Sequence, residues 1–545
     1  MKKNNFLLSL IIATLYFLFN RYAVQNFDED AYILYRYVDM FNKGYGITYY
    51  PGAQPIEGAT DFLWLVMLIG ISKLGFDVGT AAILLNSIGV FIVNFILLKL
   101  IFRIENITQR IFFASISILW LLFYPLIAAL GGFSVLMYCG LFIIPLFLIH
   151  DRIHLAYIPL FAISLGLFRP DGVVLGFFLT LITLYLLIKE KRNHVIKLFS
   201  LNILIAVGIG FFYYIWRYNY FGNALPLPLY VKQTGGFIVN LKNNISNALL
   251  YKHFFIYVFI IMIFCVFYWK IAKSKLILLV PALFLYLFLS ISHQSQNIGF
   301  RFQATIIISM IFVITAIIVE IINKKTPKSY LIYFVPFLFL IADLKTINEL
   351  KYRFNKNANN EISIPEFTHE FSKKLLKGNE TIALTEAGFF SFFQTKNNKL
   401  IDLVGLNTPY TAKNKLNLKY YTALDPDVIY YMRPNKMPPN EFNNKLYKKV
   451  ETVAEFQNAY DLNEIWNLAK YSKVPLATQQ SIIYLSKHWN EYDVYFLRYR
   501  KDPYRISEYT FALKKELKNS QNFEKLLDSL KSNSKSLTYY DLIKR

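Results

Sequence analysis

Cysteine is scarce in this chain of 545 residues, and it occurs only in apolar surroundings. The two cysteines, Cys139 and Cys265, both fall inside long apolar runs. A disulfide framework or a thiolate metal site requires several cysteines at suitable spacing. We therefore expect neither feature.

Acidic residues are also few, with 35 Asp and Glu against 58 Lys and Arg, which gives a formal net charge of +23. A strongly basic chain can bind nucleic acid, but this sequence contains no nucleic-acid-binding module. Its basic residues instead gather in short loops between apolar runs, as membrane orientation requires. We expect the lipid bilayer to be a partner of this chain and nucleic acid not to be one.

Apolar residues make up 55% of the chain, too large a share for one soluble domain. Several apolar runs approach the roughly 20 residues that a helical membrane span requires. The eleven runs cover about residues 5–20, 79–102, 111–130, 134–149, 154–168, 172–188, 196–216, 254–270, 275–292, 302–323 and 329–344. Arg21, rather than a small-residue cleavage site, follows the first run, so we expect it to be retained as a span. The sequence predicts a polytopic α-helical membrane protein.

A further apolar run, residues 62–74, is too short to span a bilayer and follows Thr60 and Asp61, a plausible helix cap. If this run is not a span, the basic loops all fall on one side, which the positive-inside rule identifies as the cytoplasm. Those loops contain Lys2, Lys3, Lys99, Arg103, Arg110, Arg152, Lys189, Lys191, Arg192, Lys197, Lys270, Lys273, Lys275, Lys324, Lys325 and Lys328. We predict an interfacial helix at 62–74, a cytoplasmic N-terminus and an extracytoplasmic C-terminus.

The long apolar runs end near residue 344, and the remaining soluble region is large enough for a core of its own. We predict strands at 381–385, 400–404 and 427–431, a helix near 389–394, and mostly helix over 507–544. The predicted domains are a transmembrane catalytic domain, residues 1–344, whose first outer loop covers 21–78, and a soluble extracytoplasmic α/β domain, residues 345–545.

The first outer loop contains three consecutive carboxylates, Asp28, Glu29 and Asp30, at the start of a predicted helix over 28–41. One carboxylate is enough to cap a helix, and charges beside a bilayer are costly. Three adjacent carboxylates therefore favour catalysis over capping, with one of them acting as a general base on a hydroxyl group.

Four cations stand at the outer ends of predicted spans: Arg169, Arg217, Lys232 and Arg301. Because the outer loops are otherwise poor in Lys and Arg, these residues are candidates for holding a phosphate at headgroup depth. Snorkelling to ordinary lipid headgroups is the alternative. His293, in the last outer loop before the soluble region, has no His or Cys partner at ligand spacing, so we expect no metal.

Short motifs occur in order along about residues 20–410. In the first outer loop they are Glu29-Asp30-Ala31-Tyr32-Ile33, Arg36-Tyr37, Gly44-Tyr45-Gly46, Pro51-Gly52 and Glu57-Gly58-Ala59-Thr60-Asp61-Phe62-Leu63-Trp64. Beyond it they are Arg169-Pro170-Asp171-Gly172, Tyr220-Phe221-Gly222-Asn223-Ala224-Leu225-Pro226, Tyr230-Val231-Lys232, Ala387-Gly388 and Leu400-Ile401-Asp402-Leu403-Val404-Gly405-Leu406. The series resembles GT-C glycosyltransferases, in particular terminal arabinofuranosyltransferase-like and mannosyltransferase-like membrane enzymes.

The resemblance implies an inverting transferase that takes its sugar from a polyprenyl-phosphate donor and has a catalytic carboxylate in the first outer loop. Tyr45, Glu57, Asp171 and Tyr230 lie in the matching motifs and, with His293, are our candidates for binding substrate. Tyr45 would stack on a sugar ring or belong to an interfacial aromatic belt. The sequence has no nucleotide-sugar fingerprint, as expected of a lipid-linked donor, and we expect no separate cofactor.

The chain departs from the family pattern at three places. One is near Gly299-Phe300-Arg301-Phe302, where an acidic residue often seen before the family's RF motif is missing. Where the family has a glutamate after the third span, this chain reads Gly132-Phe133-Ser134-Val135, so no role for that glutamate is transferred. Glu29 replaces the first aspartate of the acidic pair, and Asp28 precedes it. The choice of base therefore stays open among the three carboxylates.

From these features we expect an integral, multi-pass glycosyltransferase of a bacterial inner or plasma membrane. It would move one sugar to a hydroxyl of a glycan, lipid or protein outside the cytoplasm. Asp30 or Glu29 would take the proton, and the outer cations would stabilise the leaving phosphate. A transporter or flippase of lipid-linked saccharides is one alternative, although the sequence lacks matching repeat halves. An O-antigen polymerase or ligase is the other.

The predicted orientation can be checked with reporter fusions. Because Lys2 and Lys3 keep the N-terminus inside and the number of spans is odd, alkaline phosphatase fused after Arg545 should be active. Green fluorescent protein at the same place should be dark. The reverse pair of results would contradict both the orientation and the interfacial helix at 62–74.

Overall fold

The computed structural model describes residues 2–24, 27–58, 60–232, 252–292, 294, 297–326, 329–342, 344–353, 364–433, 447–470, 472–502, 505–517, 520–532 and 539–543. The chain divides into two compact units. The helical unit comprises Met1–Val24, Asp61–Arg217 and Gly235–Lys351, and the sheet unit comprises Gln25–Thr60, Tyr218–Thr234 and Tyr352–Arg545. The predicted division at residue 344 lies close to the end of the helical unit. Two earlier segments, however, belong to the sheet unit.

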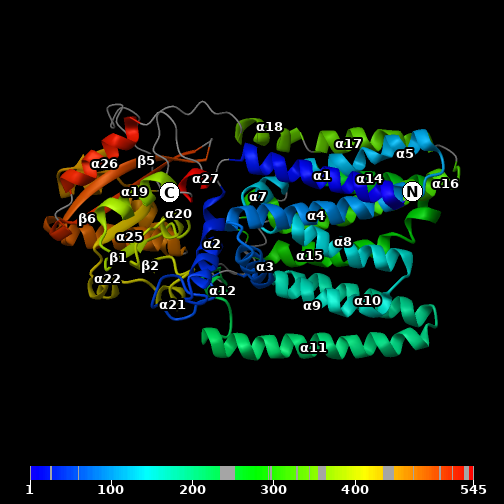
Figure 1. Cartoon of the computed structure of the whole chain (residues 1–545), viewed down its shortest axis with the longest axis horizontal. Coiled ribbons are helices and arrows are strands. Elements are labelled where there is room, and N and C mark those ends of the chain that lie inside the picture. The colour runs from blue at the N-terminus through cyan, green and yellow to red at the C-terminus, as the bar shows by residue number, and fades with distance from the viewer. Residues whose placement is uncertain are drawn as a thin grey trace. The chain divides into compact units, whose positions relative to one another are not determined.

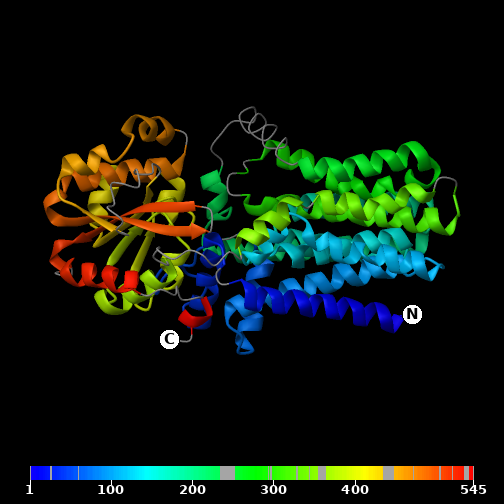
Figure 2. The ribbon, with the colours of Figure 1, turned by 90° about the horizontal axis from the view of Figure 1, so that it is seen from above.

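The helical unit consists of helices that run side by side in both views (Figures 1 and 2). Its α-helices are α1 (Lys2–Ala23), α3 (Phe62–Lys73), α4 (Val78–Ile101), α5 (Ile107–Ala114), α6 (Ile116–Leu119), α7 (Leu126–Leu130), α8 (Val135–Asp151), α9 (Ile158–Phe168), α10 (Gly172–Lys189), α11 (Asn193–Phe221), α14 (Lys252–Ala272), α15 (Val280–Ile291), α16 (Ala304–Asn323), α17 (Val335–Ala342) and α18 (Leu344–Arg353). Short 3-10 helices are η1 (Trp120–Leu122), η2 (Leu155–Tyr157), η3 (Leu276–Leu279), η4 (Ile298–Gln303) and η5 (Ser329–Phe334).

Among the described helices, six are long and apolar enough to cross a membrane: Asn4–Ala23, Val78–Ile101, Gly172–Lys189, Asn193–Phe221, Phe254–Ala272 and Ile298–Asn323. The other five predicted spans fall on shorter apolar helices, Ile107–Leu122, Val135–Asp151, Leu155–Phe168, Leu276–Ile291 and Ser329–Ala342. The prediction of a polytopic helical membrane protein is confirmed, whereas the total of eleven spans stays a prediction.

Burial differs sharply between the long helices. The apolar window of α16 is 94% buried inside the protein, but that of α11 is only 17% buried. Figure 1 shows α11 at the edge of the helical unit, and its side chains include the exposed Leu204, Val207 and Phe212. A helix that is apolar on all sides and exposed suits contact with lipid.

The α4 helix fixes the start of α8 by close packing and by one buried amide. An added Cβ at Gly89 would collide with the main-chain oxygen of Leu136, so the two helices approach as closely as only glycine permits. The Asn86 side chain donates from Nδ2 to the Phe133 carbonyl (2.9 Å) and accepts from the Leu136 amide (3.1 Å). These bonds satisfy main-chain groups at the α8 N-terminus and hold the turn before it.

The sheet unit is a mixed six-stranded sheet with the order β2-β1-β3-β6-β5-β4. Its strands are β1 (Thr381–Leu384), β2 (Lys399–Asp402), β3 (Val428–Arg433), β4 (Tyr447–Val450), β5 (Tyr492–Asp502) and β6 (Arg505–Lys514). In register, Ile382 pairs with Leu400 and Val428 in parallel, and Tyr430 pairs with Phe511 antiparallel. The parallel half thus places the ends of β1 and β2 side by side.

Helices cover both faces of this sheet (Figure 2). The α-helices of the unit are α2 (Glu29–Asn42), α12 (Leu227–Lys232), α19 (Ile364–Leu375), α20 (Phe389–Phe392), α21 (Pro409–Lys413), α22 (Leu418–Leu424), α23 (Val453–Asn458), α24 (Leu462–Ala469), α25 (Lys473–Lys487), α26 (Ser520–Ser532) and α27 (Tyr539–Leu542), and its 3-10 helices are η7 (Trp489–Glu491) and η8 (Lys515–Leu517). Phe511 packs on Phe371 of α19, whereas Ile429 and Ala512 share a core with Ile482 of α25.

The strands predicted at 381–385, 400–404 and 427–431 and the helix near 389–394 are confirmed as β1, β2, β3 and α20. The prediction of mostly helix over 507–544 holds for the described residues of η8, α26 and α27, but β6 occupies the first part of this range. Residues 508–513 are buried, and β6 lies between β3 and β5, so both of its edges are paired. Aromatic and branched residues at alternating positions, such as Tyr509 and Phe511, suit a strand.

The contact between α4 and α8 yields a stability test. Gly89→Ala should destabilise the protein by about 1–3 kcal/mol, the usual cost of overpacking, because its Cβ meets main-chain atoms. Gly208→Ala is the matched control, since nothing lies within 4 Å of an added Cβ there. Thermal unfolding in detergent should show a lower midpoint for the first variant alone. Equal midpoints would contradict the close packing.

Candidate functional site

The loops at one end of the helical unit bring together a group of charged and aromatic side chains, which we call the polar cluster. Its members are Asp61, Phe133, Ser134, Tyr138, Arg169, Asp171, Arg301 and Phe302. They come from the segment before α3, the start of α8, the turn between α9 and α10, and η4. The sequence placed all of these loops on the outer side of the membrane, and the structure confirms that they meet.

A buried ion pair lies at the centre of the cluster. Arg169 Nε donates to Asp171 Oδ1 at 3.0 Å, and their side chains are only 5% and 10% exposed. The Arg169 guanidinium carbon is 5.0 Å from the ring centre of Tyr138 and 5.1 Å from that of Phe302. Its Nη1 also donates to the main-chain oxygen of Arg301 at 3.4 Å. The α9–α10 turn is thereby tied to η4.

Arg301 is held by an aromatic ring rather than left to move in solvent. Its guanidinium carbon is 3.9 Å from the ring centre of Phe133, within cation–π range. The turn that presents it contains Gly299 and Phe300, both at positive φ, of 58° and 56°. A bulky residue rarely adopts this conformation, and such strain is common at functional sites. The structure thus brings Arg169 and Arg301 together, and binding of phosphate by either residue stays a prediction.

Asp61 does not cap α3, so that prediction is wrong. It occupies the N-cap position, but its side chain makes no capping hydrogen bond. Its Oδ2 instead accepts from the Ser134 hydroxyl at 2.8 Å. Burial raises the pKa of Asp171, and the charge of Asp61 adds to this shift while Arg169 opposes it. Sequence reasoning missed Asp61 and Ser134 as site residues, although Asp61 lies in the motif that begins at Glu57.

Two polar atoms of the cluster are buried without a hydrogen bond from any described residue: Oδ2 of Asp171 and the Tyr138 hydroxyl. Most buried polar atoms in proteins are paired, since leaving one unpaired costs about 1–3 kcal/mol. These atoms leave hydrogen-bonding capacity for a polar ligand beside two arginines.

The other two predicted cations take separate places. Arg217 is buried near the end of α11, where the adjacent Trp216 packs on Phe62 with ring centres 5.3 Å apart. Lys232 ends α12 in the sheet unit, and its side chain lies outside the described part of the structure. Convergence of Arg217, Lys232 and Arg301 on one phosphate therefore stays a prediction.

The three consecutive carboxylates lie at the start of α2 in the sheet unit and are half-buried. Asp28 is the N-cap residue, yet its side chain makes no capping hydrogen bond. The Glu29 carboxylate accepts from the Gly388 amide, which follows β1. Side-chain capping by Asp28 thus does not explain why three carboxylates stand together here. Glu29 has a hydrogen-bond partner, the Gly388 amide, that the sequence did not reveal.

Three of the remaining predicted substrate residues, Tyr45, Glu57 and Tyr230, belong to the sheet unit. Tyr45 is 43% exposed, whereas Glu57 is buried and accepts from the Leu227 amide through its main-chain oxygen at 3.1 Å. Tyr230 is half-buried under the Lys413 ammonium, 5.7 Å from its ring centre. His293 lies outside the described residues. A role in substrate binding stays a prediction for each of them.

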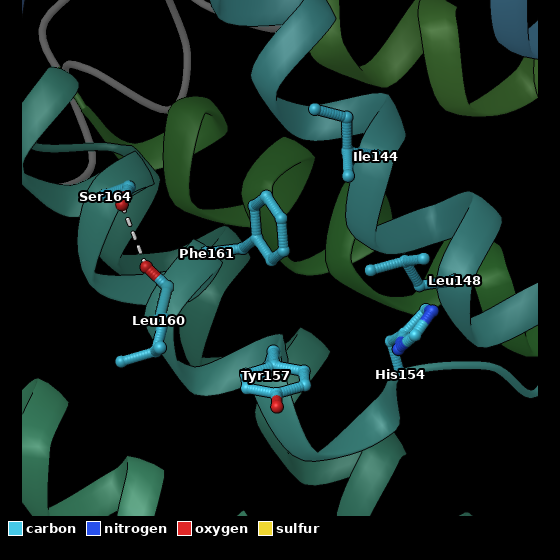
Figure 3. Close-up of a pocket in the computed structure, with 7 residues that line it drawn as sticks. All are labelled: Ile144, Leu148, His154, Tyr157, Leu160, Phe161 and Ser164. Atoms are coloured by element: carbon cyan, nitrogen blue, oxygen red, sulfur yellow. Dashed lines mark hydrogen bonds between the residues drawn. The ribbon is translucent and has the colours of Figure 1, made fainter.

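Figure 3 shows a cavity of about 490 Å³ between α8 and η2–α9. Its lining is mainly apolar, with Ile144, Leu148, Leu160 and Phe161, and the Ser164 hydroxyl bonds back to the Leu160 carbonyl at 2.8 Å. It adjoins the end of α8 opposite Ser134. Among the described side chains, no three His, Cys, Asp or Glu residues form a metal-binding group. The polar cluster is therefore the better candidate site.

Comparison with known proteins gives three findings. A family model described as "Domain of unknown function (DUF8728)" matches residues 351–495. No protein of curated function matches the sequence significantly. Two solved structures are similar in fold, namely ArnT from Cupriavidus metallidurans bound to undecaprenyl phosphate and the arabinofuranosyltransferase AftD from mycobacteria.

These structural likenesses are distant. ArnT has 12% sequence identity and a TM-score of 0.46 over 80% of this chain and 93% of its own. AftD has 10% identity and a TM-score of 0.45 over 83% of this chain but only 37% of its own. No residue role is carried over from either protein. This chain has helices long and apolar enough to cross a membrane, and its fold is distantly similar to these two structures.

Proposed function

We propose that this protein is an inverting membrane glycosyltransferase. It moves one sugar from a polyprenyl-phosphate donor to an acceptor hydroxyl of a cell-envelope glycan, lipid or protein on the non-cytoplasmic face. The observation that carries the proposal is the polar cluster, in which Arg169 and Arg301 are held together at one end of a membrane-type helical unit. Arginine pairs suit phosphate, which accepts several charge-assisted hydrogen bonds.

In the proposed reaction, the acceptor oxygen bonds to the anomeric carbon while the bond from that carbon to the phosphate oxygen breaks. The acceptor proton passes to a carboxylate, and the electron pair of the broken bond leaves with the polyprenyl phosphate. Cations fixed before the reaction stabilise the charge that develops on this phosphate. The sugar already carries a good leaving group, so the reaction requires no cofactor.

The carboxylate that accepts the proton is proposed to come from Asp28, Glu29 and Asp30. General bases contribute most when they are positioned before the substrate arrives, and α2 holds all three at its first turn. Tyr45, Glu57, Tyr230, Asp171 and His293 are proposed to bind the substrates.

The base can be tested with amide variants. Asp28→Asn, Glu29→Gln and Asp30→Asn should each fold, and the one that removes the base should lower transfer at least about 100-fold. Asp39→Asn, a carboxylate of the same helix that pairs with Lys43, is the control. Transfer of labelled sugar from synthetic polyprenyl-phosphate sugar would be measured in detergent, with acceptor extracted from cells lacking the protein. Full activity in all three variants would exclude this acidic segment as the base.

The cations can be tested in the same assay. Arg301→Ala should cost about 2–4 kcal/mol of transition-state stabilisation, as removal of one electrostatic stabiliser does elsewhere. Arg217→Ala tests the second predicted cation, and a residue that merely snorkels should leave turnover unchanged. Arg192→Ala is the control. Arg192 pairs with Glu190 in the loop between α10 and α11, whereas the polar cluster is at the start of α10. If Arg301→Ala behaves like this control, the polar cluster does not bind the donor phosphate.

A further inference from the structure

Helix α2 docks on the sheet at the carboxyl ends of two neighbouring parallel strands, β1 and β2. From the loop after β1, the Gly388 amide donates to the Glu29 carboxylate, and the Ala387 carbonyl accepts from the Tyr49 hydroxyl at 2.6 Å. From the loop after β2, Asn407 Oδ1 accepts from the Tyr37 hydroxyl at 2.8 Å. In open α/β sheets this edge is where ligands usually bind. Here a helix of the same chain occupies it.

The loop after β2 is itself fixed by a buried carboxylate. Asp402 is fully buried, and its Oδ1 accepts from the amides of Val404 (2.9 Å) and Gly405 (3.1 Å). Its Oδ2 accepts from both the main-chain amide and the side-chain Nδ2 of Asn407, each at 2.9 Å. Because Nδ2 of Asn407 is engaged in this way, Oδ1 is the atom that faces Tyr37. Asp402 therefore fixes the orientation of the Asn407 amide, whose Oδ1 accepts the hydrogen bond from Tyr37 of α2.

Two glycines permit this contact. An added Cβ at Gly58 would collide with both the Tyr37 hydroxyl and Asn407 Oδ1, directly over their hydrogen bond. An added Cβ at Gly388 would collide with the main-chain oxygen of Glu29. Both glycines belong to motifs found in the sequence, although those motifs lie far apart along the chain.

The two attachment points define the position of the helix. Glu29 lies in its first turn, and Tyr37 lies eight residues later, a rise of roughly 12 Å along the axis. Between them, the Tyr32 ring packs on Phe389, Phe392 and Phe393, with ring centres 4.9, 5.3 and 5.2 Å apart. Two hydrogen bonds and a packed ring fix both the direction and the rotation of α2, and with them the neighbouring Asp30.

We propose that the sheet unit is a positioning device for the acidic segment, and that Glu29 is a positioning residue rather than the base. Asn407, oriented by Asp402, and the Gly388 amide hold α2 so that Asp30 or Asp28 meets the acceptor hydroxyl. This inference rests on the proposed glycosyl transfer and deepens it. It assigns a role to the soluble region, which the sequence left open.

The test compares conservative and disruptive variants of the full-length protein in the transfer assay. Glu29→Gln keeps an oxygen that accepts from Gly388, so its kcat should clearly exceed that of Glu29→Ala, in which a misplaced base should lower kcat about 10- to 100-fold. Tyr37→Phe and Gly58→Ala should lower kcat with little change in KM for the donor. Tyr431→Phe is the matched control, because it removes a buried hydrogen bond between the Tyr431 and Tyr460 hydroxyls elsewhere in the sheet unit.

Hydrogen–deuterium exchange over residues 27–42 provides the second readout and requires no substrate. Glu29→Ala and Tyr37→Phe should lose protection there, while Glu29→Gln and Tyr431→Phe should keep it. Activity of Glu29→Gln as low as that of an inactive Asp30→Asn would make Glu29 the base and overturn the proposal. Unchanged protection in Tyr37→Phe would overturn it as well. If the parent transfers no sugar, the proposed function fails, and the exchange pattern still decides whether the sheet positions α2.

Discussion

Polar groups buried away from water must be paired with one another, and this requirement shapes both units of the chain. In the sheet unit, Asp402 is satisfied by four donors from its own loop. In the helical unit, Arg169 pairs with Asp171, and Asn86 satisfies the start of α8. Each of these groups fixes a loop that would otherwise have several conformations, because an unpaired buried group costs more than most single contacts contribute.

The fixed loops are also the places where distant segments meet. Arg169 and Arg301 are 132 residues apart, and Tyr37 and Asn407 are 370 residues apart. At the contact between Tyr37 and Asn407, Gly58 has no side chain that would push the two segments apart. The short motifs of the sequence therefore have a physical meaning: Tyr37 of the Arg36-Tyr37 motif and Gly58 of the Glu57-Gly58 motif both meet Asn407, which directly follows the motif from Leu400 to Leu406.

The charged side chains of the two units are presented by different kinds of structure. The acidic segment belongs to the sheet unit rather than to the helices that precede and follow it in sequence. Its carboxylates are thus presented by a folded α/β layer with an extensive aromatic core. The cations of the polar cluster are presented by the helical unit. In both units these charges are held by buried contacts rather than by solvent-exposed ion pairs, which contribute little.

The sequence by itself determined the membrane class, the helices, the parallel strands β1 to β3 and the list of candidate charges, because hydrophobic periodicity and charge placement are local properties. It did not determine β6, whose two edges pair with β3 and β5 and which begins a Lys-rich stretch that favoured helix. Nor did it reveal that Asp61 bonds to Ser134 instead of capping α3, or that Glu29 bonds to the Gly388 amide. Only the tertiary structure decided these pairings, since a hydrogen bond between residues hundreds of positions apart leaves no periodic signal in either segment.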